Sequence, residues 1–240
     1  SVSEGWDPDG RFDGCLEFDD NIGFDLAERT LNGVTNGITI SVWLDGYREG
    51  GENWVVSAGI TPYDSNVYYL DVIVPDGDDD FVYWRAGNDT NDLLIWNDAT
   101  PSDWVGDWHL FAFVKDENAG TMSIYFDADV AKSKSGTAKS LVNLVDTPFS
   151  VGARIGRDND YIGKMDDLRV YDYALSKGKI EELFRGGDVG VAWGPSPYDG
   201  QPDATVTADL IWKPGNWASS HEVYFGTSKQ DVEDANNSWD

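Results

Sequence analysis

The chain has 240 residues, and its 44 acidic and 17 basic side chains give a formal net charge of −27. This charge repels nucleic-acid phosphates and anionic membrane surfaces, so neither is expected as a partner. Many aspartates have no basic residue to pair with, which favours the binding of divalent cations. A hydrophobic content of 40% and 26 glycines indicate a folded, turn-rich protein with a sizeable core.

The cysteine content and the N-terminal segment further limit the class of protein. Cys15 is the only cysteine, so an intramolecular disulfide and a cysteine-type zinc site are excluded. No apolar run reaches about 18 residues, so no membrane-spanning segment is predicted. The opening SVSEGWDPDGRF lacks the charged start and apolar middle of a secretion signal. Either a signal has been removed or the sequence is a piece of a longer chain, and we expect the second.

Short strand-like runs begin at residue 15 and alternate with clusters of Gly, Asp, Asn and Pro. Ten such runs within about 160 residues leave no room for helical crossovers, which favours antiparallel pairing. The predicted fold class is therefore all-β, an antiparallel β-sandwich. The ten runs are CLEFD, GITISVWLDGY, WVVSAGI, VYYLDVIV, FVYWRAG, DLLIWND, WHLFAFVKD, TMSIYFDA, FSVGARIG and KMDDLRVYDY.

One segment, LSKGKIEELFRGG, has the periodicity of a helix. Ser176 is placed as an N-cap, apolar residues follow at Ile180, Leu183 and Phe184, and Gly186 is a stop signal. One short helix is therefore predicted at the end of the first domain.

Beyond that helix the sequence becomes rich in Pro, Gly and Ser, which is typical of a linker. We predict a first domain over residues 1–187 and a linker with a partial second β unit over 188–240. Strands of the second unit are expected near Ala208–Trp212 and His221–Phe225.

The run YIGKMDDLRVYDYALS predicts a strand with two adjacent aspartates. Strand alternation places Asp166 on one face with Leu168 and Val170, and Asp167 on the other face with Arg169. A buried ionised carboxylate requires a cation or hydrogen-bond donors. Asp167 can interact with Arg169, whereas the partner of Asp166 is open: a calcium ion, backbone N–H groups, or a basic side chain.

Six segments occur in the order found in laminin-G-like domains of the concanavalin A-like lectin/glucanase fold, which the chain resembles over residues 10–187. The most specific segment joins a Gly-Lys-x-Asp-Asp-x-Arg-x-Tyr strand to a short helix after Ala-Leu-Ser. The resemblance implies a jelly-roll sandwich. The segments are GRFDGCLEFDD, GITISVWL, DWHLFAFVKD, TMSIYFDA, FSVGARIG and YIGKMDDLRVYDYALSKGKIEELF.

The chain departs from the family pattern at two places. DADVAKSKSG stands where the family has a Val-Asp-Gly hairpin, so a remodelled turn is expected, and the opening strand is represented at most by SVSEGW. The tail from PSPYDGQ resembles the start of a fibronectin type III-like module. Such a sandwich needs about 100 residues, whereas about 50 remain, so the module is expected to be cut off.

The resemblance also implies a structural calcium ion at the sandwich rim, held in part by Asp166. Calcium takes six to eight oxygen ligands. Asp19 and Asp20 in EFDD, with nearby backbone carbonyls, are the expected companions. The acidic loop PDGDDDF lacks the residue order of an EF-hand loop and is expected to be a solvated hairpin tip.

The middle third of the sequence interleaves aromatic residues with amide and charged ones. A sugar ring has an apolar C–H face and a polar rim, so flat aromatic side chains flanked by hydrogen-bonding groups suit it. The alternative is that these rings pack in the sandwich core. The predicted ligand-binding residues are Trp54, Tyr69, Asp71, Tyr83, Trp84, Arg85, Asn88 and Trp96.

Signals for catalysis are poor. Glucanases of this fold carry two glutamates flanking an aspartate, whereas LEFDDNIGF has Glu17 and Asp19 but no second glutamate. The two histidines, His109 and His221, are expected to be structural, so no Ser-His-Asp triad is predicted.

The sequence therefore predicts a noncatalytic carbohydrate-binding module of a larger secreted bacterial protein, with polysaccharide as partner and calcium stiffening the scaffold. An extracellular location and further domains on the same chain follow from that prediction. Its main alternative is an adhesion or structural module of a surface protein or filament that binds protein. A glycosidase of unfamiliar design is the third hypothesis.

Overall fold

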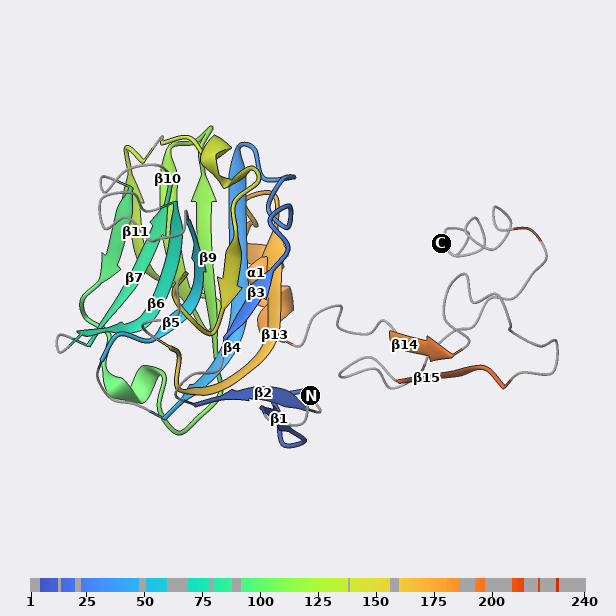
Figure 1. The fold of residues 1–240 in the computed structure, drawn as a ribbon. Coiled ribbons are helices and arrows are strands. Elements are labelled where there is room, and N and C mark those ends of the chain that lie inside the picture. Colours follow the sequence, from blue (N-terminus) through green and yellow to red (C-terminus); the bar gives the residue numbers. More distant parts are fainter. Residues whose placement is uncertain are drawn as a thin grey trace. The chain divides into compact units, whose positions relative to one another are not determined.

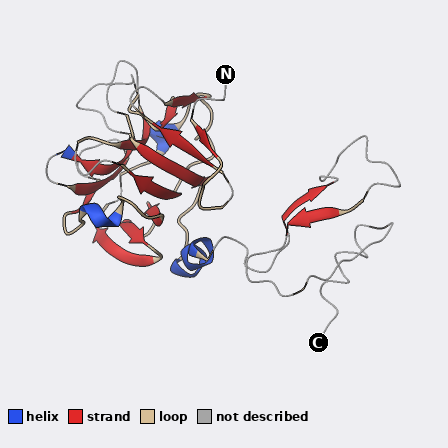
Figure 2. Cartoon of the chain, turned by 90° about the horizontal axis from the view of Figure 1, so that it is seen from below, coloured by secondary structure: helices blue, strands red, loops and turns tan. Residues whose placement is uncertain are grey.

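The first of two compact units is a β-sandwich made of two sheets, with one short α-helix (Figures 1 and 2). The two units are Ser1–Phe184 and Arg185–Asp240. The predicted antiparallel all-β sandwich is confirmed. The computed structural model describes residues 5–12, 14–19, 23–47, 51–59, 69–77, 80–87, 92–137, 139–155, 160–185, 193–196, 209–213, 220 and 228.

The larger sheet has seven strands in the order β1-β2-β13-β4-β9-β10-β11, with antiparallel neighbours throughout. The last long strand of the unit, β13, returns to lie between β2 and β4, so both ends of the first unit meet in this sheet. The strands are β1 (Trp6–Asp7), β2 (Cys15–Phe18), β4 (Gly37–Gly46), β9 (His109–Asp116), β10 (Thr121–Phe126), β11 (Asp129–Ser135) and β13 (Gly163–Tyr171).

The smaller sheet has six antiparallel strands in the order β3-β12-β5-β6-β7-β8. Its central part, β5-β6-β7-β8, follows the chain as a meander. The strands are β3 (Phe24–Leu26), β5 (Trp54–Ala58), β6 (Leu70–Asp76), β7 (Phe81–Ala86), β8 (Leu93–Trp96) and β12 (Phe149–Val151), and the short 3-10 helices are η2 (Pro101–Asp103) and η3 (Val142–Leu144).

Each of the ten predicted runs overlaps a strand, but β1, β3, β11 and β14 (Trp193–Ser196) were not predicted. β11 has the sequence DVAKSKS and is largely exposed, so it carries no apolar periodicity. It is connected to β10 by a two-residue turn, in which Asp127 and Ala128 have φ angles of 47° and 70°. Two left-handed residues suit the twist of a tight hairpin.

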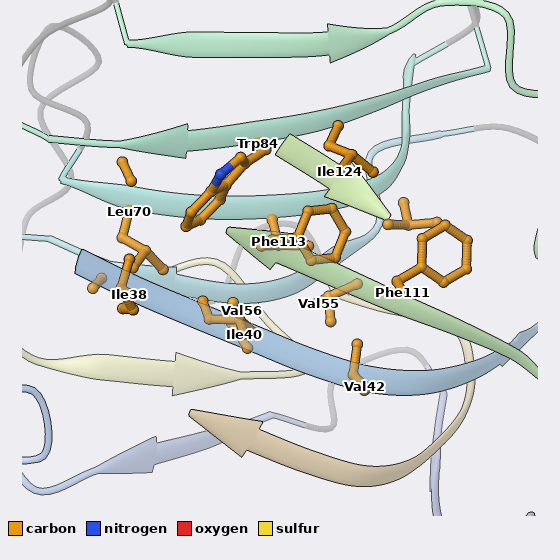
Figure 3. Packing of buried hydrophobic residues seen from close by; sticks show 14 of the residues in the cluster. Ile38, Ile40, Val42, Val55, Val56, Leu70, Trp84, Phe111, Phe113 and Ile124 are labelled. Atoms are coloured by element: carbon orange, nitrogen blue, oxygen red, sulfur yellow. The ribbon is translucent and has the colours of Figure 1, made fainter. Parts of the chain in front are cut away.

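The main core lies between the two sheets (Figure 3). Alternate residues of β4 and β9 project into it, including Ile40, Val42 and Phe113, all fully buried. From the opposite sheet comes Trp84, whose ring centroid lies 5.9 Å from that of Phe113. Burial of this apolar surface is the main stabilising term of the sandwich.

A second apolar cluster lies on the outer face of the seven-stranded sheet, beneath α1 (Lys177–Phe184). Ile180 and Leu183 pack there with Trp43. Phe184 stacks on the Trp43 ring with centroids 5.7 Å apart, and the Arg11 guanidinium lies 4.4 Å from the Trp43 ring centroid. The predicted helix is therefore confirmed, and its apolar face covers part of this sheet.

A buried ion pair joins the two sheets. Lys115 of β9 is fully buried, and its Nζ donates to the Ala86 carbonyl at 2.7 Å and to the Asp92 carboxylate at 2.5 Å. The backbone N–H of Lys139 also donates to Asp92, at 2.6 Å. Burial lowers the pKa of Lys115, because desolvation disfavours its charged form.

The second unit contains an antiparallel pair, β14 (Trp193–Ser196) and β15 (Ile211–Lys213). β15 overlaps the strand predicted near Ala208–Trp212, whereas the strand predicted near His221–Phe225 lies outside the described residues. The fibronectin type III-like interpretation stays a prediction. In the part of the chain that the structure describes, no helix is long and apolar enough to cross a membrane.

Candidate functional site

Side chains along β7 alternate between the core and the outer face of the six-stranded sheet, so neighbouring predicted ligand-binding residues lie on opposite faces. Trp84 is fully buried in the main core, and its Nε1 donates to the Val114 carbonyl at 3.2 Å. Its neighbours Tyr83 and Arg85 point to the opposite, outer face of the six-stranded sheet and are partly exposed. Because two aromatic residues follow one another, the sequence alone does not show which of them faces the core.

Five of the eight predicted residues are buried, which is the correction to the sequence-based assignment: Tyr69, Trp84 and Trp96 in the main core, and Trp54 and Asp71 on the outer face of the six-stranded sheet. Trp84 offers no accessible surface to a ligand. Trp96 is 9% exposed and packs on Phe126 at a centroid distance of 5.4 Å. Tyr69, also 9% exposed, belongs to the main core cluster. Asn88 lies outside the described residues.

An aromatic and aliphatic row crosses the outer face of the six-stranded sheet. Trp54 pairs with Ile73, Ile73 with Tyr83, and Tyr83 with Ile95 on four successive strands. Trp54 is 3% exposed, and the Arg154 guanidinium lies 5.3 Å from its ring centroid. The accessible ring of the row is therefore Tyr83.

A polar row runs beside it. Asp25, Ser150, Ser57, Asp71 and Arg85 are successive cross-strand partners on β3, β12, β5, β6 and β7. Asp71 is fully buried: it accepts a hydrogen bond from Ser57 Oγ at 3.0 Å and lies 3.6 Å from an Arg85 nitrogen. Because a buried carboxylate requires such partners, the Arg85 side chain is held at a fixed place.

We call Trp54, Asp71, Tyr83, Arg85 and Arg154 the outer-face patch. Its accessible part combines a phenol ring with a guanidinium group 5.7 Å from that ring's centroid. The Arg85 side chain is 16% exposed, so a small part of it lies at the surface of the sheet. The patch thus places a flat aromatic ring beside a guanidinium group.

The predicted metal residue Asp166 lies at a β-bulge. The pairing of β13 with β4 shifts register between Asp166 and Arg169, and Asp167 has a φ angle of 47°. Leu168 and Val170 pack against the main core, whereas Asp166 lies opposite Trp43 of the second cluster. The assignment of Asp166 to the face of these aliphatic residues was wrong, because the bulge interrupts the alternation.

Backbone N–H groups satisfy Asp166, which is one of the alternatives left open above. Its Oδ2 accepts from the Phe12 N–H at 2.9 Å and its Oδ1 from the Asp167 N–H at 2.7 Å. Asp167 itself forms a 2.7 Å ion pair with Arg169, and burial raises the pKa of the Asp167 carboxyl. Each Asp166 oxygen keeps a second lone pair, so a cation could still approach it.

The proposed companions of Asp166 are not brought to it in the described part of the chain. Asp19 is exposed beyond the end of β2, where Phe18 pairs with Gly163. This register separates Asp19 from Asp166 by about 13 Å along the strands. Asp20 lies outside the described residues, among which no three Asp, Glu, His or Cys side chains form a metal-binding group. Calcium stays a prediction.

The family model described as concanavalin A-like lectin/glucanases superfamily, Laminin_G_3, matches residues 18–181. The match covers more than half of the chain, so the protein belongs to this superfamily. The predicted resemblance to laminin-G-like domains is thus confirmed for the first unit. None of the curated proteins matches the chain.

Solved structures with the same fold include sugar-binding domains. Domain 4 of AbnA, a GH43 extracellular arabinanase from Geobacillus stearothermophilus in complex with arabinotriose, has a TM-score of 0.57 and 16% identity over 74% of this chain and 79% of that one. The CBM40 of Ruminococcus gnavus IT-sialidase, bound to α2,3-sialyllactose, has a TM-score of 0.57 and 14% identity over 71% and 96%. At these identities the likeness establishes the fold.

Proposed function

We propose that the first unit is a noncatalytic polysaccharide-binding module whose ligand lies on the outer-face patch. The observation that carries the proposal is the partly exposed Tyr83–Arg85 pair, fixed from below by the buried Asp71. Tyr83 provides a surface for the C–H face of a sugar ring, and Arg85 donates hydrogen bonds to its hydroxyl oxygens. The sugar complexes of the two structural neighbours support the same class of ligand.

The extracellular location and the presence of further domains are also proposals. An extracellular role in a larger secreted bacterial protein accords with a neighbour that is a domain of an extracellular arabinanase. The second unit, with its β14–β15 pair, accords with a chain that carries further domains. In such a protein the module would hold an attached activity close to its polymer.

Alanine substitutions of Tyr83 and Arg85 test the proposed surface. Each is expected to weaken binding of a recognised polysaccharide by about tenfold, because loss of a ring or charged-donor contact costs about 1–2 kcal/mol. Affinity electrophoresis on a panel of plant and algal polysaccharides, followed by calorimetry on the best ligand, measures this. Tyr173→Ala is the matched control, since Tyr173 is 54% exposed but lies beyond β13 of the other sheet.

Two outcomes contradict the proposal. Binding that survives both substitutions places the ligand elsewhere on the protein. No binding to any polysaccharide, together with self-association or capture of a protein partner, supports an adhesion or structural module instead.

We also propose that calcium binds at Asp166, with its other oxygen ligands drawn from nearby backbone carbonyls. Calcium should then raise the melting temperature relative to chelator by about 2–4 °C per kcal/mol of binding free energy. Differential scanning calorimetry with calcium and with EDTA measures the shift, and Asp166→Asn should abolish it. Identical melting curves for the wild-type protein would remove calcium from the proposal.

A further inference from the structure

We propose that Lys115 and Asp92 form a covalent amide bond between their side chains, which links the two sheets of the sandwich. The ion pair described above is the state from which this bond forms, so freshly folded protein holds the two groups by charge alone. The reaction needs no cofactor or co-reactant and releases one water molecule. The bond would form whether or not the outer-face patch binds a glycan.

The pair lies in apolar surroundings, away from water. The side chains of Lys115 and Asp92 are 0% and 2% exposed. On the neighbouring strands the cross-strand partners of Lys115 are Ile38 of β4 and Met122 of β10, both fully buried in the main core. Such surroundings disfavour two charges and favour the neutral amine and carboxylic acid, which together hold the same number of protons.

The amine of Lys115 is placed for attack on the carboxyl group. Burial lowers the pKa of this amine, although the Asp92 carboxylate acts in the opposite direction. A neutral amine is the nucleophile that amide formation requires. The nitrogen lies 2.5 Å from Asp92 Oδ2, beside the carboxyl carbon that it would attack. Gly87 leaves room for it, because a Cβ at that position would lie 3.0 Å from Lys115 Nζ.

The hydrogen bonds around the pair also suit the amide product. The Ala86 carbonyl accepts from Lys115 Nζ at 2.7 Å, and the Lys139 N–H donates to Asp92 Oδ2 at 2.6 Å. An amide retains one N–H and one carbonyl oxygen, so it can keep both bonds. During the reaction the Lys139 N–H would stabilise the negative charge that develops on Oδ2.

Proton transfer precedes attack in this reaction. One proton passes from Lys115 Nζ to the Asp92 carboxylate and resides on Oδ1, which leaves an amine beside a carboxylic acid. The nitrogen lone pair attacks Cγ, a C–N bond forms, and the C=O electron pair moves to Oδ2. A second proton passes from nitrogen to the Oδ1 hydroxyl, the C–Oδ1 bond breaks, and water leaves. The electron pair on Oδ2 then restores the C=O bond of the amide.

A second lysine–aspartate pair provides the contrast. Lys164 Nζ of β13 lies 2.7 Å from Asp7 Oδ2 of β1, but these side chains are 15% and 22% exposed. Their mutual hydrogen bond raises the pKa of Lys164 and lowers the pKa of Asp7. Both groups therefore stay ionised, and we expect no amide between them. This pair is the internal control for the effect of burial.

Intact-protein mass spectrometry under denaturing conditions tests the proposal on the whole chain. Folded protein incubated at neutral pH should lose about 18 Da, the mass of one water, and the lighter species should accumulate with time. The same incubation in urea should give no loss, because the unfolded chain does not hold the two side chains together. An unchanged mass of the folded protein throughout overturns the proposal.

Peptide mapping locates the bond. Trypsin cuts after Arg85 and should no longer cut after an acylated Lys115, so the recovered peptide runs from Ala86 to Lys132. Chymotrypsin cuts at aromatic residues between the two linked side chains, so two peptides joined by the amide should remain. A lighter protein whose chymotryptic peptides are all linear overturns the proposal.

Lys115→Met is the matched variant, because it removes the amine and leaves an unbranched apolar side chain. This variant should keep the mass of its own sequence. Dehydration at an Asp-Gly sequence such as Asp9–Gly10 gives the same loss as an amide, but it needs no lysine and would persist in the variant. A persistent loss, or an equal crosslink between Lys164 and Asp7, overturns the proposal. Should the variant not fold, the peptide map of the wild-type protein decides.

Discussion

Replacing Asp92 by alanine is expected to lower the free energy of unfolding by about 3–5 kcal/mol, the cost of leaving a buried charge without its partner. Lys115 is fully buried and reaches Asp92 from the opposite sheet. The substitution would also remove the acceptor of the Lys139 N–H. The pair therefore ties β9 to the start of β8 and to the segment after β11.

Urea denaturation followed by tryptophan fluorescence measures the loss. Asp98→Ala is the matched control, because the Lys132–Asp98 pair is a 3.1 Å surface ion pair whose carboxylate side chain is 74% exposed. That change should cost less than about 1 kcal/mol. The double variant Lys115→Met with Asp92→Leu should recover much of the stability, since apolar replacements remove the unpaired charge. Equal losses for Asp92→Ala and Asp98→Ala would contradict the structure.

Trp84→Ala is expected to destabilise the first unit by about 3–5 kcal/mol, as for other large core truncations. The side chain is fully buried between the sheets, beside Phe113, and its loss would leave a cavity and remove the hydrogen bond from Trp84 Nε1 to the Val114 carbonyl (Figure 3). Any effect of this substitution on sugar binding would arise from unfolding.

Tyr83→Ala is the comparison that separates the two faces of β7. Tyr83 is partly exposed on the outer face, so its loss should cost about 1 kcal/mol or less of stability while weakening binding. Calorimetric melting and polysaccharide titration on the same two samples provide the measurement. A stable Trp84→Ala protein with lost binding, or a badly destabilised Tyr83→Ala protein, would reverse our assignment of the faces.

The fold was predictable because its strands are marked by turn residues and local apolar patterns. The candidate site was less predictable, as individual residues show. β4, β5 and β6 are buried on both faces, so Asp71 sits in a strand without polar–apolar alternation. On β7 the alternation exists, but Tyr83 and Trp84 are both aromatic and either could have faced inward.

Two further features depend on contacts that local sequence does not encode. The bulge at Asp166 and Asp167 adds a residue to one strand, and aspartate tolerates the left-handed conformation without any special motif. The Lys115–Asp92 pair joins β9 of one sheet to the residue that precedes β8 of the other. A lysine and an aspartate in the sequence do not show whether they form a buried ion pair or two solvated surface side chains.

The position of α1 bears on how firmly such a module can hold a polymer. The helix packs Ile180 and Leu183 over Trp43 and Leu110, which closes the central strands of that sheet to a large flat ligand. Under the proposed function, one copy would therefore contact a polymer through the six-stranded sheet only. Lasting retention on a long substrate would come from avidity, through repeated copies or a second glycan-binding module tethered nearby.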